Sequence, residues 1–425
     1  MNPSTSEMLL VLNCGSSSIK FALFDFGREP LSRRPEWGGK IGGIGQPNAA
    51  IDENGGAPQP VALGAAQPSV ARSAVGPSVA RSAADPYHAA LDLILERTRE
   101  RLAGRPLAGV VHRVVHGGHK YFEPVRLDAT VLADLRSYIP LAPLHQPFAL
   151  EAIDSLLASS PALPQIACFD TAFHHTLPAV EQMLALPWSA WERGLRRYGF
   201  HGLSYDYLSV ALPERHGDRA RGRTIVAHLG SGASLCAMRE LKSVATTMGF
   251  SALDGLMMGT RCGALDPGAV IYLMEIEKLT LEQVGHLLYH ESGLLGVSGV
   301  SPDPRVLLQE ESRTDETGER VRAALALYVR RIVREVGSLA SALGGLDMLV
   351  FTAGVGEHNA AIRERVCRDL AWLGVELDPK ANSENAPVLS TPDSRVLVGC
   401  EPTNEEWLAA LRADPLLRGS RASAG

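Results

Sequence analysis

The sequence predicts an α/β protein built from two related domains. Two similar segments carry this prediction, each an apolar strand, a tight turn rich in Gly or Ser, and a second strand. The first covers residues 8–24 and the second residues 224–238. Predicted strands and helices also alternate along the chain, which is typical of α/β architectures.

The two turns are candidate phosphate-binding loops. The first is Asn13-Cys14-Gly15-Ser16-Ser17-Ser18, and the second is His228-Leu229-Gly230-Ser231-Gly232-Ala233-Ser234. Glycine lets the backbone bend sharply and approach a ligand, and neither turn contains an acidic residue. The pair indicates a nucleotide held between two domains; two ordinary β-turns are the alternative.

In the first half of the chain, turn residues and helix signals divide the sequence into segments. Residues 28–84 are rich in Gly, Pro, Ala and Ser and contain a direct repeat (68–74 and 77–83), so we expect a poorly structured, low-complexity insertion. Asp85-Pro86 predicts the start of a helix that ends near Leu102. Strands are predicted at 109–115 and 165–170.

In the second half, the clearest element is a helix over 321–343, where apolar residues recur every three or four positions before Gly344-Gly345. A strand at 347–352 is followed by Ala353-Gly354-Val355-Gly356-Glu357. This order suits a nucleotide contact at a helix start, although the third glycine of a dinucleotide fingerprint is missing.

Composition excludes several classes of protein. The 425 residues are 45% hydrophobic and 21% charged, and the net charge of −6 disfavours general nucleic-acid binding. Six cysteines occur without metal-type spacing, which favours reduced thiols in a cytoplasmic protein. We expect neither a signal peptide nor a membrane-spanning helix.

Isolated charged residues suggest an anion site. Arg113 lies in a valine-rich strand, and Arg261 lies between glycines, so each can serve as a clamp for a carboxylate or phosphoryl group. Asp170 ends a strand, and His145 and His201 lie in constrained loops. There is no P-loop motif, and His112, His116 and His119 would not share one face as metal ligands.

These segments together resemble the acetate kinase family. The matching pieces occur in the family's order along nearly the whole chain: 13–18, 112–118, 141–145, 169–174, 198–202, 228–234, 257–268, 354–357 and 402–406. The resemblance implies two duplicated ribonuclease H-like domains of the actin, Hsp70 and sugar kinase type. The two similar segments place the domain bounds, with 1–172 plus 400–425 in one domain and 173–399 in the other. The resemblance also implies a homodimer that transfers phosphate reversibly from ATP to acetate, with Mg²⁺ or Mn²⁺.

The resemblance assigns roles to individual residues. The reaction centre would contain Arg113, Asp170, His201, His228 and Arg261, and the metal would be positioned by Asn13 and Glu405. The acetate pocket would be formed by Arg113, Val115, Leu144, His145, Phe200 and Ala252. The nucleotide would be bound by Ser16, Lys20, His228, Gly230, Ser231, Gly232, Asp303, Arg305, Gly354, Val355, Gly356 and Glu357.

Departures from the family pattern leave alternatives open. Ala252 replaces a common proline, and a smaller wall could admit propionate. Ser231 and Gln146 stand where asparagine is usual. A propionate or short-chain acyl kinase is therefore the nearest alternative, and a catalytically silent nucleotide-binding protein is another.

Overall fold

The computed structural model describes residues 6–15, 17–64, 85–143 and 145–422, with side chains up to residue 419. The direct repeat, Ser16 and Leu144 lie outside the described residues. The chain divides into two compact units, one formed by Met1–Ala172 with Asn404–Gly425 and the other by Phe173–Thr403. No helix in the described part of the chain combines the length and apolar character needed to cross a bilayer.

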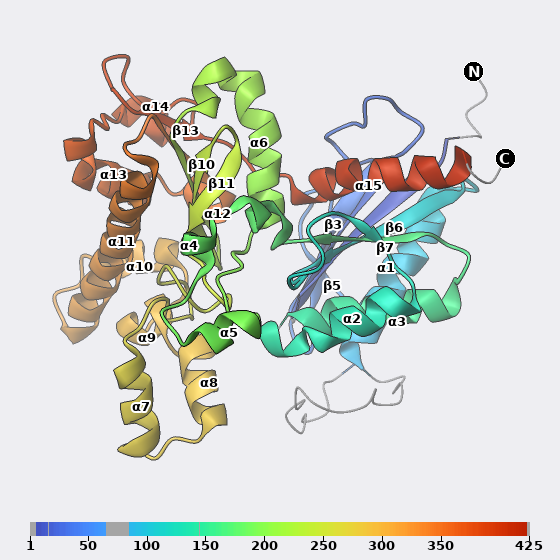
Figure 1. Ribbon diagram of the computed structural model, residues 1–425, viewed down its shortest axis with the longest axis horizontal. Coiled ribbons are helices and arrows are strands. Elements are labelled where there is room, and N and C mark those ends of the chain that lie inside the picture. Colours follow the sequence, from blue (N-terminus) through green and yellow to red (C-terminus); the bar gives the residue numbers. More distant parts are fainter. Residues whose placement is uncertain (1–5, 16, 65–84, 144, 423–425) are drawn as a thin grey trace. The chain divides into compact units, whose positions relative to one another are not determined.

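The first unit is built around an eight-stranded sheet (Figure 1). Its strands are β1 (Met8–Cys14), β2 (Ser18–Asp25), β3 (Trp37–Gly42), β4 (Ala50–Glu53), β5 (Gln59–Pro60), β6 (Leu107–Val114), β7 (Val125–Arg126) and β8 (Gln165–Phe169). Its helices are α1 (Pro86–Leu102), α2 (Ala129–Ser137), α3 (Gln146–Ser159) and α15 (Glu405–Ala422). Figure 1 shows α15 on one face of this sheet and α2 and α3 on the other. The strands β1, β6 and β8 are almost wholly buried because helices cover both faces.

The second unit contains a five-stranded sheet. Its strands are β9 (Thr224–Leu229), β10 (Ala233–Arg239), β11 (Lys242–Thr246), β12 (Met348–Thr352) and β13 (Leu397–Cys400). The helices are α4 (Ala179–Gln182), α5 (Trp188–Glu192), α6 (Gly202–His216), α7 (Pro267–Glu275), α8 (Leu281–His290), α9 (Gly293–Ser298), α10 (Pro304–Glu310), α11 (Glu316–Leu343), α12 (Ala353–His358), α13 (Ala360–Asp369) and α14 (Pro379–Ser383). The long helix α11 packs against β9, β10 and β11.

The two sheets share one topology. The strand order β3-β2-β1-β6-β8 in the first sheet matches β11-β10-β9-β12-β13 in the second. In both sheets the first three strands are antiparallel and the last two pairs are parallel. The strand–turn–strand segments seen in the sequence are β1–β2 and β9–β10. The prediction of a duplicated α/β fold is therefore confirmed.

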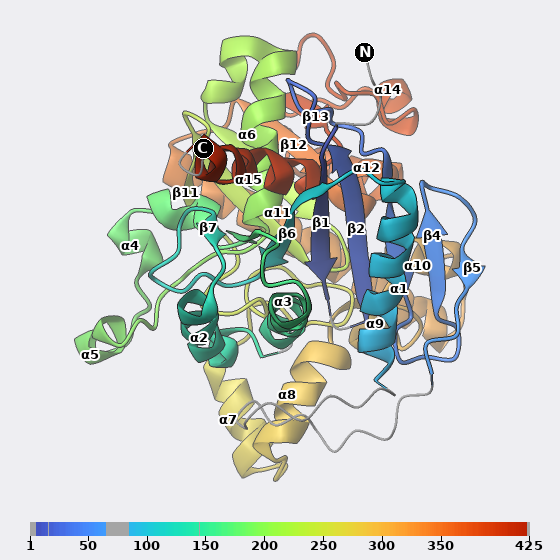
Figure 2. The ribbon, with the colours of Figure 1, turned by 90° about the vertical axis from the view of Figure 1, so that its right-hand side faces the viewer.

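The chain crosses between the units twice. It leaves the first unit after Ala172 and returns at Asn404, so that the last helix, α15, packs against β1, β2, β6 and β8 (Figure 2). The sequence prediction places the return at residue 400. Cys400, however, is the last residue of β13 and pairs with Phe351 in the second sheet.

The expectation of a poorly structured segment from residue 28 is wrong for residues 37–60. Strands β3, β4 and β5 extend the first sheet there, and Trp37, Ile41 and Ile51 are buried. The glycines reflect close strand contact, since a Cβ on Gly39 would lie 2.0 Å from the carbonyl oxygen of Asp52. A composition rich in glycine therefore misled the prediction.

Two predicted helices are confirmed, and their caps explain their bounds. Asp85 accepts a hydrogen bond of 2.9 Å from the backbone N–H of Tyr87, at the start of α1. Helix α11 begins at Glu316 rather than Val321 because Asp315 accepts from the N–H of Gly318 at 3.0 Å. It ends at Gly344 in a left-handed conformation, as predicted.

Candidate active site

In the first unit, Arg113 is held by two carboxylates. Arg113 lies on β6, and its Nε and Nη2 donate to Asp170 at 2.9 and 2.6 Å. Its Nη1 lies 2.9 Å from Glu405 Oε2, at the first residue of α15. The Asp170 side chain is only 3% exposed and that of Glu405 is 8% exposed. The two acids therefore orient the guanidinium in a nearly dry environment.

The charges of Arg113, Asp170 and Glu405 together shift the pKa values of Arg113 and Asp170. Burial alone would lower the pKa of Arg113, but Asp170 and Glu405 together raise it above its usual value. Burial raises the pKa of Asp170, and the nearby Glu405 adds to this while Arg113 opposes it. Because a nearby guanidinium stays charged, Asp170 fits the role of an orienting acceptor better than that of a general base.

The first turn lies beside Arg113. Asn13, near the end of β1, pairs in register with Arg113 on β6 and with Lys20 on β2. Lys20 is exposed, and Val115 and His145 are partly buried at the end of β6 and the start of α3. The predicted site residues Ser16 and Leu144 lie outside the described part of the chain.

Gln146 has a local structural role. It is fully buried, its Oε1 accepts from the backbone N–H of His116 at 3.1 Å, and its Nε2 donates to the His116 carbonyl at 3.0 Å. These two bonds fix the loop after β6 to the start of α3. The side chain of Gln146, which is longer than the asparagine usual at this position, is therefore accommodated by hydrogen bonds to the backbone of His116.

In the second unit, the turn between β9 and β10 gathers three predicted site residues. The N–H of Gly230 donates to the carbonyl of Gly232 at 3.0 Å, which closes a tight turn with Ser231 exposed at its tip. A Cβ on Gly232 would lie 3.1 Å from Arg261 Nη2 and 3.2 Å from His201 Nε2. The turn, Arg261 and His201 therefore lie together, and a side chain at position 232 would require the ends of these two side chains to shift.

His201 and His228 form a stacked pair beside this turn. Their ring centroids are 4.1 Å apart with an interplanar angle of 17°. His201 Nδ1 lies 2.8 Å from Ser234 Oγ, and His228 Nδ1 lies 2.9 Å from Ser204 Oγ. His201 precedes α6 in a left-handed conformation with φ of 59°. Hydrogen bonds and stacking thus hold both rings in fixed orientations.

Arg261 differs from Arg113 because it forms no ion pair with the residues that the structure describes. Its Nη1 donates to the backbone carbonyl of Ala252 at 2.7 Å. Burial lowers the pKa of Arg261, and the Tyr289 hydroxyl only partly opposes this shift. A desolvated positive charge without a carboxylate is a strong attractant for an anionic ligand.

Two predicted pocket residues lie in this unit. Phe200 precedes His201 and is 2% exposed, and its carbonyl lies 3.0 Å from His174 Nε2. The partly buried Ala252 supplies the carbonyl that receives Arg261. The side chain at position 252 can therefore vary without removing this hydrogen bond.

The remaining predicted nucleotide residues lie at two helix starts of the second unit. Asp303 caps α10 and is bound by Arg305, whose Nε and Nη2 donate to its carboxylate at 3.0 and 2.6 Å. Most of α12, which directly follows β12, is formed by the predicted residues Gly354, Val355, Gly356 and Glu357. Glu357 Oε1 accepts from the N–H of Thr403 at 3.2 Å.

Arg363 on α13 was not identified from the sequence, yet it fixes this segment. It is fully buried, and its Nη1 donates to the carbonyls of Gly356 and Glu357 at 2.8 and 2.9 Å. Its Nε and Nη2 donate to Asn382 and Asn385. All three nitrogens of the guanidinium thus donate to neutral acceptors. Burial lowers the pKa of Arg363. This contact could not be predicted from the sequence, because the two asparagine acceptors lie 19 and 22 positions further along the chain.

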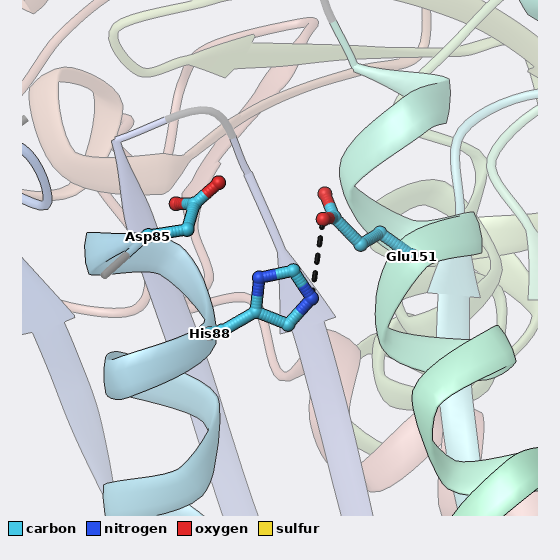
Figure 3. A group of neighbouring side chains, drawn as sticks. All are labelled: Asp85, His88 and Glu151. Atoms are coloured by element: carbon cyan, nitrogen blue, oxygen red, sulfur yellow. Dashed lines mark ion pairs between the residues drawn. The ribbon is translucent and has the colours of Figure 1, made fainter. Parts of the chain in front are cut away.

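Among the residues that the structure describes, one group of acidic and histidine side chains elsewhere is close enough to hold a metal ion. Asp85, His88 and Glu151 have ligand atoms within 4.8 Å of one another, as Figure 3 shows. Asp85 already caps α1, and His88 Nε2 lies 3.2 Å from Glu151 Oε1. These contacts between α1 and α3 account for the cluster, which contains neither Asn13 nor Glu405.

Each unit therefore places a partly buried arginine beside the turn of a strand–turn–strand segment, in a sheet of shared topology. This arrangement is suited to binding and aligning anions, as a phosphotransferase requires, because positioning and charge stabilisation dominate phosphoryl transfer.

Comparison with known proteins gives the family. Residues 8–411 match the model of the acetokinase family. An acetate kinase of Rhodopseudomonas palustris is 47% identical over 420 residues, covering 98% of this chain and 100% of the relative. The crystal structure of Porphyromonas gingivalis acetate kinase matches with a TM-score of 0.78 and 34% identity, covering 96% of this chain and 98% of that one. A propionate kinase from Francisella tularensis matches with a TM-score of 0.81 and 31% identity over the same shares.

The chain belongs to the acetokinase family. It is a kinase with a carboxylate as acceptor, and ATP is the phosphoryl donor of the family.

Proposed function

We propose that this protein is an acetate kinase that transfers the γ-phosphoryl group of ATP reversibly to acetate. The family match and the full-length relatives support the activity. The observation in the site that carries the proposal is Arg261, a desolvated guanidinium beside a glycine turn and without an ion pair in the described residues. Because its hydrogen-bond acceptor in the described residues is one backbone carbonyl, this charge favours an anion beside it.

The reaction is a direct in-line displacement. One oxygen of acetate forms a bond to the γ-phosphorus, while the bond from that phosphorus to the β,γ-bridging oxygen breaks and its electron pair leaves with ADP. A carboxylate is already ionised near pH 7, so no general base is required. The barrier lies in bringing two anions together and in stabilising the charge that spreads over the phosphoryl oxygens.

The arginines and histidines meet these requirements. Arg113 and Arg261 neutralise and align the acetate and phosphoryl oxygens, and Asp170 orients Arg113 by accepting hydrogen bonds from its Nε and Nη2. His201 donates a hydrogen bond to the transferred group, and the stacked His228 supports it. The residues assigned to the methyl end of acetate rest on the family resemblance alone: Val115, Leu144, His145, Phe200 and Ala252.

The nucleotide contacts follow the same reasoning. The Gly230–Gly232 turn receives the phosphates through its backbone, with Ser231 at the tip and Ser16 and Lys20 as further phosphate contacts. Asp303 and Arg305, together with residues 354–357, contact the adenosine part. The exposed Arg305 side chain and the tethered α12 support this assignment.

Asn13 and Glu405 fit a magnesium ion by their chemistry. Both offer oxygen donors, and both flank Arg113, Asn13 by strand register and Glu405 by its ion pair. Magnesium is usually held by one or two protein oxygens together with water and substrate phosphates. When bound there, it would supply positive charge to the phosphate oxygens.

Several finer points belong to the same proposal. We assign the two compact units to the two functional domains. A homodimer remains a prediction from the family resemblance, and a cytoplasmic location remains a prediction from the cysteine pattern.

A propionate or short-chain acyl kinase is the second candidate. The similarity to a propionate kinase structure and the small side chain of Ala252 favour it. One extra methylene typically changes discrimination by about 1–3 kcal/mol, so a single pocket position is enough to shift the preferred acid.

The test is ATP-dependent acyl phosphate formation by the purified protein with Mg²⁺, trapped with hydroxylamine, for formate, acetate, propionate and butyrate. We expect the highest kcat/KM with acetate. A propionate preference that Ala252→Val reverses would establish the second candidate. Binding of ATP without product from any acid would contradict both and favour a silent nucleotide-binding protein.

A further inference from the structure

Three polar side chains form a buried chain that ends at His201. The Tyr205 hydroxyl on α6 is hydrogen-bonded to Ser234 Oγ on β10, and Ser234 Oγ lies 2.8 Å from His201 Nδ1. Tyr205 and Ser234 are both fully buried. Each hydroxyl carries one proton, so the direction of the hydrogen bonds along this chain is constrained.

Tyr205 must be the donor to Ser234. Burial raises the pKa of the Tyr205 hydroxyl well above its usual value, so this group keeps its proton. Within the described residues its hydrogen-bond partner is Ser234. If Ser234 donated to Tyr205 instead, the buried tyrosine proton would have no acceptor in the described residues, which is energetically unfavourable.

The direction of this bond fixes the next one. Ser234 accepts from Tyr205 and has one proton left, which it donates to its other partner, His201 Nδ1. A neutral imidazole that accepts at Nδ1 carries its proton on Nε2. The flat stacking of His228 on His201 further restricts rotation of the ring.

The protonated nitrogen is the one that faces the glycine turn. A Cβ on Gly232 would lie 3.2 Å from His201 Nε2 and 3.1 Å from Arg261 Nη2, so the two nitrogens lie on the same side of this turn. A proton on Nε2 can be donated to an anion beside Arg261, whereas a bare Nε2 would repel it.

We propose that Tyr205 is a positioning residue for the reaction, and that it acts through Ser234 to hold His201 as the neutral Nε2–H tautomer. The structural inference stands on the hydrogen-bond chain. Its consequence for catalysis rests on the proposed function, in which His201 donates to the transferred phosphoryl group.

The tautomer can be measured without any turnover. Protein labelled with ¹⁵N-histidine gives nitrogen chemical shifts that distinguish the two tautomers, and loss of signals in His201→Gln assigns those of His201. We expect a protonated Nε2 in the unaltered protein. In Tyr205→Phe, the freed Ser234 oxygen can accept from Nδ1–H, so the shifts should move toward a mixture of tautomers. A protonated Nδ1 in the unaltered protein, or unchanged shifts in Tyr205→Phe, would overturn the proposal.

Kinetics test the consequence. Tyr205→Phe should lower kcat about three- to tenfold, the range expected for one neutral hydrogen bond, with little change in KM for acetate or ATP. Tyr328→Phe is the matched control, since Tyr328 is a buried tyrosine on α11 in the same unit. An equal loss of kcat in both variants would contradict a role specific to His201.

A double-mutant cycle tests the route through Ser234. Once Ser234→Ala has removed the intermediate hydroxyl, the further change Tyr205→Phe should have little additional effect on kcat. Additive effects would show that Tyr205 acts independently of Ser234. If the unaltered protein forms no acyl phosphate, the proposed function fails, while the nitrogen shifts still decide the tautomer.

Discussion

Arg113 and Arg261 lie in different units and have opposite surroundings. Arg113 contacts two buried carboxylates, which raise its pKa. Arg261 donates to a backbone carbonyl and forms no ion pair in the described part of the chain, and burial lowers its pKa. The difference separates two functions of a buried arginine. Arg113 is held and oriented by two acids of the protein itself, whereas Arg261 has no acidic partner in the described residues, so that a ligand can compensate its charge.

A third arginine of the same chain, Arg363, can be compared with Arg261. It is buried and also lacks a carboxylate partner in the described residues, yet its nitrogens donate to carbonyl and amide oxygens in five hydrogen bonds. The absence of an ion pair alone therefore does not identify an anion site. Arg261 differs from Arg363 because its guanidinium has one hydrogen-bond acceptor in the described residues, the backbone carbonyl of Ala252.

The largest effect on stability is expected at Arg113. Arg113→Met leaves Asp170 and Glu405 buried without their counter-charge, which should lower the free energy of unfolding by about 3–5 kcal/mol. Denaturant unfolding measures the loss. Adding Asp170→Asn should restore part of the stability but not the activity, because Glu405 still lacks its counter-charge. Unchanged stability of Arg113→Met would show that the two acids do not depend on this guanidinium.

Arg261 should show the reverse pattern. Arg261→Met is expected to lower kcat by about 10²–10³, or about 2.7–4 kcal/mol of transition-state stabilisation, because the charge that meets the transferred group is lost. Its free energy of unfolding should stay equal or rise, since a desolvated charge is removed. Initial rates of acyl phosphate formation and denaturant unfolding decide between these outcomes. A stability loss as large as that of Arg113→Met would remove the distinction between the two arginines.

The smallest effect is expected at Arg363. Lysine keeps the charge but cannot reproduce the planar set of donors, so Arg363→Lys should lower the free energy of unfolding by about 1–3 kcal/mol. It should also raise KM for ATP more than KM for acetate, because α12 loses its tether. Arg365→Lys on the same helix is the control, since the Arg365–Glu311 pair is partly exposed and should contribute about 0–1 kcal/mol. Equal KM values for ATP in the two variants would contradict the tether.

Local signals in the sequence predicted the elements that depend on local chemistry. These elements are recognised from residues that are close together in the sequence. They are the cap at Asp85, the periodic apolar face of α11 and both strand–turn–strand segments. The duplicated topology follows from them. Arg113, Asp170 and Arg261 could be singled out because isolated charges in apolar or glycine-rich segments are unusual.

Contacts between distant residues could not be predicted in the same way. The acceptors of Arg363 and the buried chain from Tyr205 to His201 depend on how loops and strands fold back, and no spacing encodes this. Strand β3 and its partner β4 were missed because the glycines of β3 allow close contact between the two strands, while composition alone suggested a loop. The roles assigned to the individual site residues stay predictions until the variants above are measured.

The return of α15 to the first sheet has a consequence for synthesis on the ribosome. Cys168 Sγ on β8 lies 3.7 Å from the carbonyl of Ala409 on α15, although 241 positions separate them in the chain. One face of β1, β6 and β8 therefore stays uncovered while the whole second unit is translated. Arg113 meanwhile has Asp170 but not Glu405. The first unit, although it emerges first, is completed last, and a nascent chain would need protection of this sheet face until α15 has emerged.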